Sequence, residues 1–361
     1  MIIESIELSN FRNYERAEVS FSEKINVLYG ENAQGKTNLL EAACLSGTAK
    51  SHKGCKDREM IRFSEEEAHI ITKVRKKTGE FRIDLHLKRH KTKGIAINRV
   101  PIARAHDLFG ILHVVFFSPE DLNMIKNGPG ERRHFLDAEI CQLDRVYLSE
   151  LTKYNKALAQ RNHLLKDIAK NPALKTTLPM WDQTLAMYGK RVIKKREEFI
   201  QSLNGIIKGI HSDLSGEREI LTMAYEPDVS DEALEEELAL SGERDIYMGS
   251  TSRGPHRDDV IFKINDIDIR HFGSQGQQRT AALSLKLAEI ELVEQRISDL
   301  PVLLLDDVLS ELDHNRQNFL LKRIGKIQTL MTCTGLDEFV KNNVKIDRLF
   351  KVENGTITEG N

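Results

Sequence analysis

The chain has 361 residues, enough for about two domains with a substantial buried core. Its 53 Lys plus Arg against 55 Asp plus Glu give a formal net charge of -2, which argues against a protein that coats nucleic acid by bulk positive charge. The 40% hydrophobic and 30% charged residues are typical of a globular protein, not a disordered or fibrous one. Because no apolar run reaches membrane-helix length and no secretory signal is visible, a cytoplasmic protein without a membrane segment is expected.

The first third of the chain predicts strands around one glycine turn and helix. Residues 2–8 alternate apolar and polar, and Ile25–Tyr29 is an apolar run that stops at a glycine. From Lys36 the apolar residues recur at helical spacing. Residues 68–99 predict antiparallel hairpins, and a further strand over 111–117 ends before a proline, which cannot continue a β ladder.

The middle of the chain predicts a helical insertion. From Glu131 to His211 the composition shifts to Leu, Ala, Lys, Glu and Arg, which predicts two or three long helices broken near Pro172 and Pro179. An acidic connector follows at 226–245, where nine acids and one base give a local charge of -8.

The last third returns to alternating strands and helices. The expected elements are strands within 260–270 around a turn at 265–266, a helix at 277–297, a buried strand at 302–305, a helix from Asp313 and a strand at 329–332. The predicted fold is therefore a discontinuous α/β domain of residues 1–130 and 246–361, with a helical arm at 131–245 inserted between its halves.

A phosphate-binding loop is predicted at Gly30–Thr37, which fits G-x-x-x-x-G-K-[ST] between a predicted strand and helix. Its glycines let backbone N–H groups wrap phosphates, Lys36 would reach the β- and γ-phosphate oxygens, and the Thr37 hydroxyl would hold Mg²⁺. The alternative, a glycine turn with an incidental lysine, is disfavoured by this context. The predicted nucleotide-binding residues are Gly30, Glu31, Asn32, Ala33, Gln34, Gly35, Lys36, Thr37 and Asn38.

The predicted apolar strand at 302–305 is followed directly by two carboxylates, Asp306 and Asp307. Asp306 is predicted to lie in the Mg²⁺ shell, and Asp307 to orient or deprotonate an attacking water, so Asp307 and Lys36 are the predicted catalytic residues. A capping aspartate after a strand is common, so this interpretation depends on the phosphate loop. Asp313 follows in Ser310–Asp313, which could equally be an ordinary helix start.

A second anion-binding turn is predicted at Gly273–Thr280, before a helix. One triphosphate does not require two anion-binding turns from the same chain. We therefore expect two copies to face each other, so that the second turn of each copy completes the nucleotide site of the other. The alternative is a capped helix start. The predicted trans-acting residues are Ser274, Gln275, Gly276, Gln277 and Gln278.

The order of these motifs resembles the ATP-binding-cassette (ABC) ATPases of the chromosome-maintenance, SMC-like branch. The segments FFSPEDL, GPHRDD, SQGQQRT and LLLDDVLSELD look like the RecF family of DNA replication and repair proteins, with similarity from the first strand to about Thr334. The resemblance implies an ABC-type P-loop head with an inserted arm, ATP and Mg²⁺ as cofactors, ATP-dependent homodimers with Asp313 facing the partner, and slow, DNA-stimulated ATP hydrolysis. It also implies binding to single-stranded DNA and single-strand/double-strand junctions in recombination, replication and the SOS response, with RecR, RecO and RecA as partners.

Four positions depart from the broader cassette pattern. Ala33 stands where glycine is frequent, Asp307 where glutamate is usual, Ser118 where a glutamine is expected, and Thr334 where transporter ATPases place a histidine. A shorter base and no switch histidine predict weak turnover, with ATP acting as a conformational clamp.

For DNA the sequence predicts regions only. Residues 71–99 carry ten bases and two acids, a local charge of +8 that could follow phosphates without reading bases. The run Arg132-Arg133-His134 is a second candidate, and Arg257 could contact nucleotide, partner or its own carboxylates. The alternatives from other classes are an ATPase subunit of a membrane transporter and a small-molecule P-loop kinase.

Overall fold

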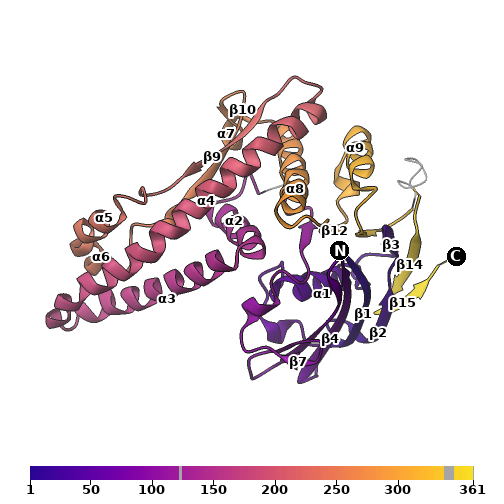
Figure 1. Cartoon of the computed structure of the whole chain (residues 1–361), viewed down its shortest axis with the longest axis horizontal. Helices are drawn as coiled ribbons and strands as arrows, with labels where there is room; N and C mark the ends of the chain where they lie inside the picture. The colour runs from indigo at the N-terminus through magenta and orange to yellow at the C-terminus, as the bar shows by residue number, and fades with distance from the viewer. Residues whose placement is uncertain (122–123, 337–344, 361) are drawn as a thin grey trace. The chain divides into compact units, whose positions relative to one another are not determined.

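The computed structural model describes residues 1–121, 124–336 and 345–360, and the chain divides into two compact units. The first unit is built from Met1–Leu122 and Lys286–Asn361, and the second from Asn123–Leu285 (Figure 1). This division differs from the predicted boundary at 245/246. Residues 246–285 lie in the second unit, because strand β10 (Asp259–Ile264) pairs antiparallel with β9 (Leu221–Glu226).

A six-stranded sheet of the first unit has the order β15-β14-β3-β13-β12-β8. All its neighbouring strands are parallel except the pair β14 and β15. Parallel neighbours end at the same edge, so the segments after β3, β12 and β13 meet there. Its strands are β3 (Ile25–Tyr29), β8 (Val114–Phe117), β12 (Val302–Asp306), β13 (Thr329–Cys333), β14 (Arg348–Glu353) and β15 (Thr356–Glu359).

The C-terminal hairpin of β14 and β15 was not predicted. Its turn is Asn354–Gly355, and both residues have positive φ. An Asn-Gly pair between short alternating runs is a hairpin signal, so the sequence contained the information.

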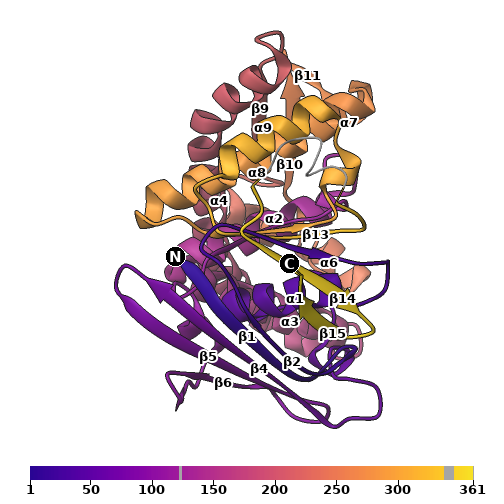
Figure 2. The ribbon, with the colours of Figure 1, turned by 90° about the vertical axis from the view of Figure 1, so that its right-hand side faces the viewer.

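The second sheet of the first unit is antiparallel, with the order β2-β1-β4-β5-β6-β7 (Figure 2). The predicted hairpins at 68–99 are confirmed as β4, β5 and β6, whereas β2 was not predicted. Its strands are β1 (Ile2–Phe11), β2 (Tyr14–Ser20), β4 (Glu67–Lys76), β5 (Gly79–Lys88), β6 (Gly94–Ile97) and β7 (Val100–Pro101).

Helix α1 (Lys36–Thr48) contacts strands of both sheets and is buried around most of its circumference. The sequence predicted one apolar side only. Even Glu41 is fully buried, and Arg12 donates to both its carboxylate oxygens at 2.7 and 2.8 Å. Burial opposes ionisation of Glu41, but the hydrogen bonds from Arg12 and Ser51 outweigh it and hold its pKa below the usual range.

The second unit contains the predicted long helices, of which α3 and α4 pack on each other. Pro172 begins a 3-10 turn between them, as the predicted break requires. Pro179 does not break a helix, because it lies in the first turn of α4, where a missing N–H costs nothing. These helices are α2 (Pro129–Leu143), α3 (Arg145–Ile168) and α4 (Leu178–Ser215).

The acidic segment 226–245 is more ordered than a connector. It contains α5 (Leu234–Leu240) and the start of α6 (Gly242–Met248). Asp245 is fully buried and accepts a hydrogen bond from the equally buried Arg161 at 2.7 Å. The charge of this segment is thus partly used inside the unit.

The rest of the second unit is a three-stranded sheet, β11-β10-β9, followed by α7 and α8. Both residues of the predicted turn, Asn265 and Asp266, have positive φ, as a tight hairpin turn requires. The remaining elements are β11 (Ile267–Asp268), α7 (Ile269–Phe272), α8 (Gln275–Ile297), which continues into the first unit, and α9 (His314–Ile324) of the first unit. Within the described residues, every helix is too short or too polar to cross a membrane.

Candidate nucleotide-binding site

The loop between β3 and α1 is held in a conformation that only glycine allows at two positions. Gly30 has φ 152° and Gly35 has φ 117°. A Cβ on Gly30 would lie 2.3 Å from the Val352 carbonyl oxygen, and one on Gly35 would lie 2.6 Å from Nδ2 of Asn13. The motif glycines are therefore required by both backbone and space.

Ala33, the predicted departure in this loop, has φ 64°. This left-handed conformation costs an L-residue about 1 kcal/mol, and glycine would adopt it freely. The structure thus explains why glycine suits this position.

The Lys36 side chain turns back into the loop. Its Nζ donates to the carbonyl oxygens of Gly30 at 2.6 Å and Glu31 at 2.8 Å, and only 6% of the residue is exposed. Burial lowers the pKa of Lys36, and the negative charges of Asp307 and Asp306 act against this lowering. The ammonium group is thus placed inside the loop and near both predicted carboxylates.

Thr37 and Asp306 meet although 269 residues separate them, because β3 and β12 end at the same sheet edge. Thr37 Oγ1 donates to Asp306 Oδ1 at 2.8 Å. Thr332, at the end of β13, donates to the same oxygen at 2.8 Å. A carboxylate beside hydroxyls is a set of hard oxygen donors of the kind that Mg²⁺ prefers, so the donor chemistry fits this ion.

Asp307 lies directly after β12 with φ 53°, and its N–H donates to Thr332 Oγ1 at 2.9 Å. Burial raises the pKa of its carboxyl group. The charge of Lys36 opposes this rise, whereas the neighbouring charges of Asp306 and Glu311 add to it. Because its pKa is raised and it lies half-buried beside the predicted phosphate loop, the Asp307 carboxylate is suited to accept a proton.

The loop is also fixed by two segments that the sequence analysis missed. At the start of β2, the Tyr14 hydroxyl donates to the Gly35 carbonyl at 2.9 Å, and in the preceding turn Asn13 Nδ2 donates to the Gln34 carbonyl at 2.8 Å. In the C-terminal hairpin, the Asn354 N–H donates to Gln34 Oε1 at 2.6 Å. No local pattern marked these contacts, because each partner is distant along the chain.

Other predicted loop residues take different positions. Glu31, Asn32 and Ala33 are exposed at the tip of the loop. The Asn38 side chain donates to Asn13 Oδ1 at 2.8 Å, so it helps to hold the loop in place.

The predicted trans-acting turn belongs to the second unit, whereas the predicted phosphate loop belongs to the first. Ser274 is exposed; its Oγ accepts from the Gln277 N–H at 3.2 Å, and its N–H donates to Gln277 Oε1 at 2.9 Å. This reciprocal pair is a capping box at the start of α8. Gln278 is buried and donates to the Ile269 carbonyl at 2.8 Å, so its side chain supports the turn from behind, while Gln275 is exposed and Gly276 partly exposed.

Three further predicted positions lie in the first unit. Asp313 is the N-cap of α9, accepting from the Arg316 N–H at 3.0 Å, and its side chain is half exposed. Ser118 donates to Asp121 through its N–H at 2.8 Å and its hydroxyl at 3.1 Å. Thr334 follows β13 and is exposed.

Five of the ten basic residues of 71–99 form ion pairs with acids, which reduces the predicted DNA-binding charge. Arg75 donates to Glu4 and Glu23 at 2.7 Å each, and the Arg82 guanidinium lies 2.7 Å from an Asp84 oxygen. The local count of +8 missed this pairing because several of the acids belong to other strands and turns. The other paired bases are Lys73 with Glu7, Lys93 with Asp57 and Arg89 with Glu66.

The prediction that Arg132 contacts DNA is wrong, because its side chain is buried. It is 2% exposed and donates to both carboxylate oxygens of Asp259, at 2.7 and 2.9 Å. Arg133 donates to the Asp258 carbonyl at 2.7 Å, while Arg257 reaches the Thr251 carbonyl at 3.5 Å. The predicted GPHRDD segment thus supplies internal partners for arginines of the second unit.

Known proteins match this chain over its whole length. The RecF/RecN/SMC N terminal domain family matches residues 2–358. The "DNA replication and repair protein RecF" of Agathobacter rectalis is 61% identical over 357 residues, with 99% of each chain covered. A solved structure of "the recombination mediator protein RecF-ATP in RecFOR pathway" is 37% identical with a TM-score of 0.93, covering 99% of this chain and 97% of that one.

The fold comparison extends to more distant proteins. A solved SMC head bound to the C-winged helix domain of ScpA has a TM-score of 0.58 at 15% identity, with 100% of this chain and 97% of that chain covered. The predicted ABC-type head fold with a helical insertion is therefore confirmed, and the transporter-subunit and kinase alternatives are not favoured. The chain belongs to the RecF/RecN/SMC family and, within it, to the RecF proteins of DNA replication and repair.

Proposed function

We propose that this chain is a weak ATPase that binds DNA in recombinational repair and replication, with ATP acting as a conformational switch that closes a homodimer. The observation that carries the proposal is the junction of Thr37, Asp306 and Thr332 at one sheet edge, beside a glycine loop enclosing Lys36. A glycine loop, a lysine and oxygen ligands for Mg²⁺ are the groups that a nucleoside-triphosphate site needs. The RecF-ATP structure, similar over 99% of this chain, supports ATP as the nucleotide.

Within this proposal, the loop N–H groups and Lys36 bind the phosphates, and Thr37 and Asp306 hold Mg²⁺. When bound, Mg²⁺ supplies positive charge that neutralises the phosphate oxygens. The Lys36 ammonium group is held inside the loop by the Gly30 and Glu31 carbonyls and would exchange these partners for phosphate oxygens. Thr332 orients Asp306 and also binds the Asp307 backbone, which couples the two carboxylates.

Asp307 is assigned as the general base of a slow hydrolysis. Replacing Asp307 by asparagine is expected to slow ATP hydrolysis about 100-fold or more, since a positioned base contributes at least that factor. Asparagine keeps the size and tolerates the backbone at φ 53°. Because burial raises the Asp307 pKa, the wild-type rate should fall on acidification at a higher pH than an ordinary aspartate gives, and the variant should lack this pH dependence.

Single-turnover rates measured across pH check this prediction, with Glu353→Gln as the control. Glu353 is an exposed acid of the same unit, paired with Lys351 at 2.8 Å. An Asp307→Asn protein that hydrolyses ATP at the wild-type rate would remove Asp307 from the mechanism.

The second unit is proposed to act on the partner's nucleotide. The exposed capping box at Ser274 leaves a small-residue turn at the N-terminus of α8, suited to approach a phosphate from outside. Asp313, on the exposed start of α9, is proposed to face the partner copy.

The pathway named for the solved relative supports RecR and RecO as partners of this chain. RecA loading is the proposed outcome at single-strand/double-strand junctions.

The decisive experiment measures mass by light scattering with ATP, ADP or no nucleotide, each with and without gapped DNA. We expect dimers with ATP but not with ADP or without nucleotide. Gapped DNA should increase the dimer fraction, and the affinity for DNA should fall as the salt concentration rises. If ATP changed neither the mass of the protein nor its affinity for DNA, the proposed function would be contradicted.

A further inference from the structure

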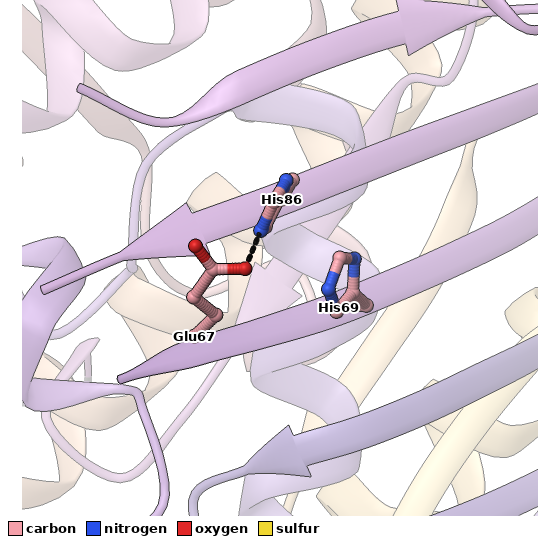
Figure 3. A group of neighbouring side chains, drawn as sticks. All are labelled: Glu67, His69 and His86. Atoms are coloured by element: carbon pink, nitrogen blue, oxygen red, sulfur yellow. Dashed lines mark hydrogen bonds and ion pairs between the residues drawn. The ribbon is translucent and has the colours of Figure 1, made fainter. Parts of the chain in front are cut away.

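Three metal-ligand side chains gather on the outer face of the antiparallel sheet, away from the phosphate loop. Glu67 and His69 lie two residues apart on β4, so both point to the same face. His86 on β5 is the direct cross-strand partner of His69. Figure 3 shows the three side chains turned toward one another above the two strands.

Their ligand atoms are close together. Glu67 Oε2 lies 2.7 Å from His86 Nε2, and the rings of His69 and His86 stack with centroids 4.0 Å apart. One ligand atom from each residue lies within 4.8 Å of the other two. Ligands of a tetrahedral zinc ion are about 3.3 Å apart, so small side-chain rotations would bring all three to bonding distance. Across residues 1–121, 124–336 and 345–360, no other three His, Cys, Asp or Glu side chains meet this criterion.

The donor set selects a class of metal. Two imidazoles and a carboxylate suit Zn²⁺ and neighbouring transition-metal ions, whereas Mg²⁺ prefers oxygen donors. Binding requires a neutral imidazole and an ionised carboxylate, so the affinity of such a site depends on pH.

We propose that Glu67, His69 and His86 form a binding site for Zn²⁺ or a similar divalent transition-metal ion, which links β4 to β5. His69 also lines a shallow hollow together with Ser9, Arg16 and Glu18 of β1 and β2. The site uses no residue of the nucleotide-binding loop and does not depend on the proposed ATPase function.

A single ion pair between Glu67 and His86 does not account for the arrangement. It leaves unexplained why a second imidazole stacks on the first, where two protonated rings would repel each other. A shared metal ion uses all three side chains.

Titration of the full chain with zinc chloride, followed by calorimetry, tests the proposal. We expect His69→Ala and His86→Ala each to weaken this binding by more than about tenfold, because each removes one of three protein ligands. Zn²⁺ should raise the melting temperature of the wild type and not that of the double variant, since it binds the folded strands. Mg²⁺ should not compete.

Two control variants separate this site from other zinc ligands. His163 is an exposed histidine whose Nδ1 lies 2.9 Å from Asp167, a two-residue pair on one helix, so His163→Ala should leave the affinity unchanged. Cys55→Ser removes the partly exposed thiol and should also have no effect. Melting curves without zinc confirm that each variant folds. Equal zinc affinity in the wild type and the double variant, or no zinc binding by the wild type, would overturn the proposal.

Discussion

Replacing Lys36 by alanine is expected to abolish ATP-induced dimerisation and to weaken ATP binding by about 100-fold or more. Hydrogen bonds to a charged group contribute about 1.5–3 kcal/mol each, and the buried ammonium is placed to make at least two with phosphate oxygens. Sedimentation with saturating ATP measures the dimer, and binding of a fluorescent ATP analogue measures the affinity.

The control for Lys36→Ala is Lys50→Ala, an exposed lysine just after the same helix, which should behave as the wild type. Alanine also removes the donor to the Gly30 and Glu31 carbonyls, so thermal unfolding must show that the variant folds. Lys36→Arg keeps the charge but not the compact ammonium group, so intermediate binding is expected. Persistence of ATP-dependent dimers in Lys36→Ala would refute the role of this lysine.

Replacing Ser274 by arginine is expected to leave ATP binding by the monomer intact and to block dimerisation completely. Ser274 is exposed and belongs to the unit that does not contain the phosphate loop. A long side chain there would project into the partner's nucleotide site, if that site is completed in trans. Titration of ATP into the variant, together with its mass in ATP by light scattering, separates the two effects.

Arginine at this position also removes the helix cap, which costs about 1 kcal/mol of stability. Ser274→Thr is the matched control, because its hydroxyl can still accept from the Gln277 N–H. The threonine variant should dimerise with ATP. If Ser274→Arg instead lost nucleotide binding as a monomer, the trans assignment would be wrong.

The strand, glycine turn and helix of the predicted phosphate loop could be predicted because their pattern is local. A strand, a glycine turn and a helix start must be consecutive to cradle phosphates, and Ile25–Tyr29 and the start of α1 at Lys36 were predicted to the residue. The strand before Asp306 was equally clear, since four apolar residues between Pro301 and Asp306 predict a buried strand. The pairing of Thr37 with Asp306 follows from both strands ending at one sheet edge.

Prediction was weaker wherever charge or apolar pattern was counted within one segment. Half of the ten bases in 71–99 pair with acids, and some of these acids, such as Glu4 and Glu7 on β1, are brought near only by the strand pairing. Arg132 looked exposed in sequence and is buried against Asp259, 127 residues away. The acidic segment 226–245 forms short helices because buried partners such as Arg161 take up some of its charge.

The sequence by itself determined the fold class and the family, because each is marked by short motifs whose residues are adjacent in the chain and whose order along it is distinctive. Only the tertiary structure decided which distant groups complete the site: Thr332 on Asp306, Asn13 and Asn354 on the loop, and the opposition of His69 to His86. The reason is physical. Strand register and the shared edge of a parallel sheet are collective properties of packing, and no local pattern encodes which side chains they bring within hydrogen-bond distance.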